Sequence, residues 1–121
     1  MLGVVVAAAM GARAEDEATP PPDGAALYAI YCSSCDSADG RGRTPLAELL
    51  REAPPDLATI ASRRGGWFPE DLVREIIDGR FVGHGERDMP VWGRTLTRAE
   101  LDAITDHLHS LQDQALTQAH E

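Results

Sequence analysis

The chain has 121 residues, enough for one domain at most, and 20 acidic side chains against 11 basic ones give it a formal charge of −9 at pH 7. Every basic residue is arginine, and an acidic surface disfavours nucleic acid and anionic lipid while suiting a basic docking partner. Aromatic residues make up only 5% of the chain, so the core that the protein can build from its own side chains is thin.

The N-terminal residues differ in composition from everything that follows. A small and apolar run over residues 2–10 precedes Ala12-Arg13-Ala14, which fits the small-x-small pattern of a signal-peptidase site. The run is too short to span a bilayer as a helix. We predict a signal peptide over residues 1–14 and a periplasmic protein, free or peripheral to the inner membrane. An uncleaved tether is the alternative, because no Lys or Arg precedes the run. Residues 15–23, EDEATPPPD, predict an extended acidic leader.

Short helices separated by turns are predicted along the first half of the domain. Pro45 suits a first helical turn, and the leucines after it recur at the i, i+3, i+4 spacing of one helix face. Clusters of Asp, Gly and Pro between the helical segments favour turns. The helices predicted for this half are residues 24–35, 45–52 and 57–64.

The second half predicts two stronger helices and one unusual loop. Residues 68–79 carry a proline and acidic side chains in the first turn and end at a glycine. Thr97-Arg98-Ala99-Glu100 is a capping box that starts the last helix, and no segment shows strand alternation, so the predicted class is all-α. The loop over residues 80–95 is long, and we expect its large apolar side chains to pack against an apolar object. The apolar stripe of the last helix is Leu101, Ile104, Leu108 and Leu111, and the apolar loop residues are Phe81, Met89 and Trp92.

The chain has two cysteines, Cys32 and Cys35, in a C-x-x-C pattern. In an exported protein such a pair forms a disulfide, a metal site or a thioether-linked haem. A haem c attachment site reads C-x-x-C-H, in which the histidine binds the iron, but the residue at position 36 is an aspartate.

The order of these motifs resembles a bacterial, monohaem class I c-type cytochrome. The C-x-x-C helix, the PPDL segment, the PEDLVREIIDG helix, the Met-Pro-x-Trp-Gly loop and the last amphipathic helix follow one another from Gly24 to Leu111. The resemblance implies a cytochrome c-like domain over residues 24–112, in which short helices and long loops wrap around one covalent haem c, followed by a polar tail over residues 113–121. It also implies electron transfer with a redox protein donor or acceptor, or within a respiratory complex.

The resemblance implies a haem site with one altered position. Cys32 and Cys35 match the two attachment sites, Met89 matches the distal iron ligand and Trp92 matches a residue that packs in the haem pocket. Asp36 occupies the position of the proximal histidine, so the motif reads C-x-x-C-D.

The aspartate changes the expected iron chemistry. A carboxylate is a hard anionic ligand that suits ferric iron, so it would lower the potential that imidazole and thioether ligands raise. Its side chain is also shorter than that of histidine. We expect Asp36 to be a weak, water-bridged or absent fifth ligand, which would leave the iron high-spin and open to small ligands. His84, in the same loop as Met89, is an alternative iron ligand.

Other functions for the same residues stay open. The main alternative is a haem-free relative with a Cys32–Cys35 disulfide that acts as an accessory or interaction subunit. A copper site from Cys32, Cys35, Met89 and His84 has soft ligands, but no pattern fixes its geometry. A thiol oxidoreductase is disfavoured, because a helix C-terminus and the neighbouring Asp36 both raise the pKa of a thiol.

No nucleophile–base grouping for hydrolysis can be assembled from the sequence, so we expect an electron-transfer protein and no enzyme. His107 and His109 lie two residues apart on a helix and therefore face different directions. We expect them to be solvated and not to bind a metal as a pair.

Overall fold

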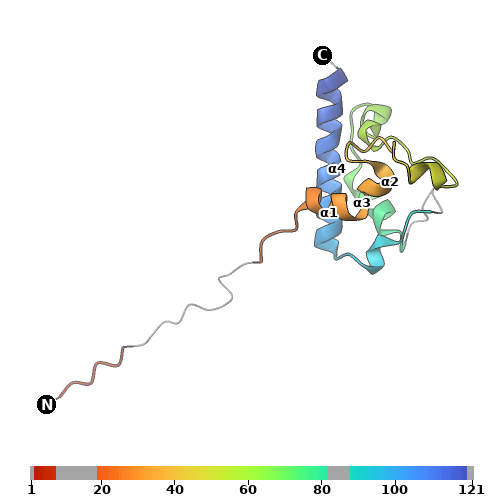
Figure 1. Cartoon of the computed structure of the whole chain (residues 1–121). Coiled ribbons are helices and arrows are strands. Elements are labelled where there is room, and N and C mark those ends of the chain that lie inside the picture. Colours follow the sequence, from red (N-terminus) through yellow and green to blue (C-terminus); the bar gives the residue numbers. More distant parts are fainter. Residues whose placement is uncertain (1, 8–18, 82–87, 120–121) are drawn as a thin grey trace.

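The structure is a computed structural model that describes residues 2–7, 19–81 and 88–119, with side chains described as far as residue 112. All regular elements within these ranges are helical, which confirms the predicted all-α class. Figure 1 shows α4 as the longest rod, crossed by α1, with the shorter elements gathered along one side of it. In chain order the elements are α1 (Gly24–Tyr31), α2 (Ser33–Asp36), the 3-10 turns η2 (Ala47–Leu49), η3 (Leu57–Thr59) and η4 (Ser62–Arg64), α3 (Glu70–Asp78), the 3-10 turn η5 (Trp92–Arg94) and α4 (Arg98–Ala119).

The helix predicted over residues 24–35 forms as two pieces, α1 and α2. The Asp23 carboxylate caps the start of α1 by accepting a hydrogen bond of 3.2 Å from the backbone N–H of Ala26. The backbone departs from regular helix geometry at Cys32, where φ is −119°, and resumes for one turn through Asp36. The C-x-x-C pair is therefore divided, with Cys32 at the junction and Cys35 inside α2.

Only a single turn, η2, forms within residues 45–52, so the prediction of a longer helix there is wrong. The hydroxyl of Thr44 accepts from the Ala47 N–H at 3.0 Å and donates to the Cys35 carbonyl at 3.2 Å, which ties this turn to α2. The backbone becomes extended at Leu50, and Leu49 is 81% exposed. The predicted apolar face is not buried, because Leu46 and Leu49 are exposed and Leu50 is only half-buried.

The two helices predicted for the second half are present. α3 begins at Glu70 and ends at Gly79, whose φ of 71° is the left-handed conformation that glycine adopts without strain. The capping box before α4 is confirmed: the Thr97 hydroxyl accepts from the Glu100 N–H at 3.2 Å, and the Glu100 carboxylate accepts from the Thr97 N–H at 3.0 Å. α4 continues to Ala119, through residues that were predicted as a tail. No helix in the described ranges is long and apolar enough to cross a membrane.

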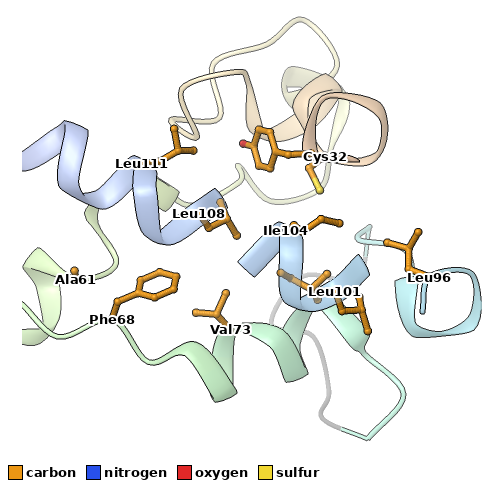
Figure 2. Packing of buried hydrophobic residues seen from close by; sticks show 11 residues of the cluster. Cys32, Ala61, Phe68, Val73, Leu96, Leu101, Ile104, Leu108 and Leu111 are labelled. Atoms are coloured by element: carbon orange, nitrogen blue, oxygen red, sulfur yellow. The ribbon is translucent and has the colours of Figure 1, made fainter. Parts of the chain in front are cut away.

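The core lies between α4, α1 and α3. The whole predicted stripe of α4 is buried, and Ile104 has no exposed surface. Figure 2 shows these side chains directed from α4 into the cluster, together with Phe68 and Val73 on the α3 side and the sulfur of Cys32 on the α1 side. Met89 and Trp92 pack against this cluster as expected for the loop, but the expectation for Phe81 is wrong. Phe81 is exposed and lies beneath the guanidinium of Arg80, 5.1 Å from the ring centroid.

α1 crosses α4 at a glycine. A Cβ atom at Gly24 would overlap the backbone carbonyl of Ala103, so only glycine allows the two helices to approach this closely. Gly24→Ala is therefore expected to lower the free energy of unfolding by about 1 to 3 kcal/mol, the range for overpacking. Ala25→Ser, which adds an atom at an exposed position of the same turn, should change it by less than about 0.5 kcal/mol in the same urea titration. Equal effects of the two substitutions would contradict the close crossing.

Candidate functional site

A cavity of about 600 Å³ opens beside the core. This volume is within the range of about 300 to 1,000 Å³ that is typical of small-molecule and cofactor sites. Its wall is built by α1, the η3–η4 segment, α3, α4 and the segment that carries Met89. Most of the wall is apolar, including Leu57, Ile60, Leu72, Val73, Ile76 and Met89.

The two cysteines are placed differently in relation to this cavity. Cys32 is 6% exposed and belongs to the cavity wall, whereas Cys35 is half-buried and does not line the cavity. Both are free thiols in the structure. Burial, with smaller contributions from Asp36 and Cys35, raises the pKa of the Cys32 thiol to about 12. A thiol of this kind is almost never ionised at neutral pH, which disfavours thiol–disulfide exchange chemistry.

Asp36 is the acidic residue of the cavity wall. Burial raises the pKa of its carboxyl group to about 6 from an ordinary value of 3.8. No hydrogen bond or ion pair to this carboxyl group is found among the described residues, which leaves a polar group facing an apolar cavity without a partner. A half-buried carboxyl without a protein partner is costly and is a candidate for contact with a ligand.

The turn after Asp36 is strained. Ser37 has φ 63° and ψ 162°, a conformation that is almost confined to glycine and costs about 1 to 3 kcal/mol for other residues. Its hydroxyl donates to Asp39 Oδ1 at 2.6 Å and accepts from the Gly42 N–H at 3.0 Å, while its carbonyl accepts from the Tyr28 hydroxyl at 2.7 Å. These bonds hold the turn that ends α2 directly after Asp36.

The strain at Ser37 can be measured with two substitutions. Ser37→Ala and Ser37→Gly both remove the hydroxyl and its hydrogen bonds, but only glycine relieves the backbone strain. We therefore expect the glycine variant to be more stable than the alanine variant by about 1 to 3 kcal/mol in urea unfolding. Equal stability of the two variants would mean that the backbone at this position is not strained.

Met89 and Trp92 belong to one segment but have different surroundings. Met89 is half-buried and lines the cavity, as Cys32 and Asp36 do. Trp92 does not line the cavity; its ring packs edge-on against Tyr31, with 5.1 Å between the ring centroids and 63° between the planes. The tryptophan thus joins the Met89 segment to the end of α1. Its direct contact with a haem stays a prediction.

The histidines are not part of the cavity wall in the described residues. His84 lies outside the described residues, so its role as an iron or copper ligand stays untested. The expectation that both helix histidines are solvated is met only in part: the side chain of His109 is 43% exposed, whereas His107 is half-buried, and both contact aromatic rings. His107 packs against Tyr28 with 5.0 Å between centroids, and His109 stacks on Phe68 at 4.7 Å.

Two arginines of the cavity wall were missed in the sequence. Arg63 and Arg64 follow the PPDL segment and line the cavity from η4. The Nε of Arg63 donates to the Thr59 carbonyl at 3.2 Å, and its Nη2 donates to the Asp56 carbonyl at 3.2 Å, which holds the side chain along η3. Two consecutive arginines stand out in a chain with a formal charge of −9, and this pattern could have marked them as candidate site residues.

Comparison with known proteins agrees with this geometry. Residues 19–108 match the family model of cytochrome c oxidase, cbb3-type, subunit III. The chain belongs to this family. Within the cbb3-type subunit III family it is a c-type cytochrome domain, and membership implies the binding of haem c. Searches of curated proteins and of solved structures found no match.

The cavity of this subunit III relative fits a haem. The porphyrin is a large apolar plate with two carboxylates on one edge, and the cavity combines an apolar wall with two basic residues, Arg63 and Arg64. Of the two attachment thiols, that of Cys32 borders this space together with the Met89 thioether and the Asp36 carboxyl, whereas Cys35 lies outside the wall in α2.

Proposed function

We propose that the protein is a periplasmic, monohaem c-type cytochrome that carries single electrons and has an atypical or missing proximal ligand. Cys32 and Cys35 hold the haem as thioethers, Met89 is the distal ligand, and Asp36 faces the iron as a weak, water-bridged or absent fifth ligand. The observation that carries this proposal is that Cys32, Asp36 and Met89 line one apolar cavity, although 57 positions separate the first and last of them in the sequence.

The haem supplies a one-electron iron couple, and the protein's residues adjust it. The Met89 thioether would favour ferrous iron, whereas the Asp36 carboxylate would favour ferric iron. Arg63 and Arg64 would pair with the haem carboxylates. The apolar wall excludes water from the porphyrin faces, which raises the effect of each nearby charge on the potential.

An axial position that is held weakly has a functional consequence. Small molecules such as cyanide, azide or carbon monoxide can compete with a water-bridged or absent fifth ligand, because no strong bond has to be broken. We therefore expect the oxidised and reduced protein to have high-spin spectra and to bind such ligands at ordinary concentrations. A sharp low-spin α band in the reduced protein would contradict a weak axial ligand.

The electron-transfer partner is proposed to be a redox protein or a subunit of a respiratory complex. The family description names an oxidase subunit, and the formal charge of −9 favours a partner with a basic docking face. Export by the N-terminal segment would bring the protein to the compartment in which such complexes accept electrons.

A second candidate function follows from one observation, the aspartate in place of the attachment-motif histidine. A haem-free chain with a Cys32–Cys35 disulfide would act as an accessory or interaction subunit. The intact mass of protein secreted from a host with cytochrome maturation factors separates the two candidates, together with a pyridine haemochrome assay. Addition of one haem is the expected result; a peptide mass lowered by two hydrogens, with no haemochrome, would support the haem-free function.

A further inference from the structure

The segment that carries Met89 is attached to the rest of the domain on both sides of the methionine. Before it, the carboxylate of Asp88 accepts a hydrogen bond of 2.8 Å from the backbone N–H of Arg51. After it, η5 brings Gly93 into a buried position against the C-terminal end of α3. The second attachment is the more enclosed, since Asp88 is exposed.

The end of α3 presents an ion pair to this segment. Arg80 binds Asp78 through two parallel hydrogen bonds, from Nε to Oδ1 at 2.7 Å and from Nη2 to Oδ2 at 3.0 Å. The backbone N–H of Arg80 also donates to Oδ1, at 3.2 Å, across the left-handed turn at Gly79. The Asp78 side chain is only 14% exposed, so the pair is better shielded than an ordinary surface pair.

Gly93 lies directly against this ion pair. A Cβ atom at position 93 would overlap the carboxylate of Asp78 and the Nε of Arg80. A larger residue at position 93 would therefore have to push the two side chains out of their present positions or move the backbone of η5 away from them. The side chains of Asp78 and Arg80 form the surface on which Gly93 packs, which we call the seat. Its position is fixed by the glycine cap of α3 and by the bidentate hydrogen bond between the two side chains.

We propose that the Asp78–Arg80 ion pair positions Met89 by seating Gly93, and thereby sets how far the Met89 thioether reaches into the cavity. The ligand role of Met89 rests on the proposed function; the seating itself does not. A methionine side chain has three rotatable bonds and no fixed shape, so the placement of its backbone determines where the sulfur can be held. Asp78 and Arg80 are positioning residues, since neither lines the cavity.

The test uses two variants that disturb the seat. Arg80→Gln breaks the bidentate hydrogen bond to Asp78, and Gly93→Ala adds a methyl group that separates the backbone of η5 from the ion pair. Arg74→Gln is the matched control, because it removes ion pairs of the same helix, with Asp71 at 2.9 Å and with Asp102 of α4 at 3.3 Å, without touching Gly93. The readout is the carbon–proton NMR signal of the Met89 methyl group, assigned with Met89→Leu, in the full chain with and without haem.

Both seat variants are expected to shift or broaden the Met89 methyl signal, while Arg74→Gln leaves it in place. A Met89 signal unmoved in both seat variants overturns the proposal, even where their thermal stability falls. The Met89 signal is also measured in the protein without haem. A negative haemochrome assay would therefore refute the proposed function, while the NMR result would still decide whether the ion pair positions Met89.

Discussion

Asp36→His is expected to convert the protein into a low-spin cytochrome with one covalent haem per chain. The imidazole restores the attachment motif and supplies a strong fifth ligand opposite Met89. We expect a sharp α band in the reduced spectrum and a midpoint potential higher by on the order of 100 mV, because imidazole replaces a carboxylate that favours ferric iron. Spectra, haem content and redox titration of protein matured alongside the wild type measure the change.

Asp36→Asn is the control for this conversion, since it removes the charge but supplies no imidazole. It should keep the high-spin spectrum and the low affinity for iron at this position. If Asp36→His remains without haem, the missing histidine is not what prevents attachment, and the haem-free function gains support. If the wild type is already low-spin, the iron has a strong fifth ligand other than Asp36.

The second large effect is a pH-dependent cost of burying Asp36 in the haem-free chain. The carboxyl group has a pKa of about 6 in the folded protein and about 3.8 when unfolded, so the folded state holds its proton more tightly between these values. Stability from this group is therefore fully present below about pH 4 and is lost as the pH rises through 6. The expected loss is about 2 kcal/mol after allowance for partial exposure.

Urea unfolding of the wild type and of Asp36→Asn, both prepared without haem, measures this cost. The chain has 20 acidic residues, so the difference between the two proteins, and not either profile alone, isolates Asp36. The asparagine variant should be more stable by about 2 kcal/mol at pH 7.5, and the advantage should vanish near pH 4. A difference that does not change with pH would show that the carboxyl group is not desolvated.

Local patterns were enough to predict the helical elements that bound the site. The capping box before α4, the glycine after α3 and the four-residue apolar stripe of α4 are all present as predicted. Each of these signals depends on residues within one or two turns of the chain, where hydrogen-bond partners and side-chain spacing are set by the sequence itself. The motif order also predicted that Cys32 and Met89 would meet, and both line the cavity.

The tertiary structure alone decided which side chains face the cavity and which face solvent. The leucines of residues 45–52 have helical spacing but none of them is buried, whereas Arg63 and Arg64 carry no periodic signal and still reach the cavity. The unpartnered burial of Asp36 and the seat under Gly93 likewise join segments that are distant along the chain. Burial is a property of the packed assembly of helices: a residue loses contact with water only when other segments cover it, and no local pattern contains those segments.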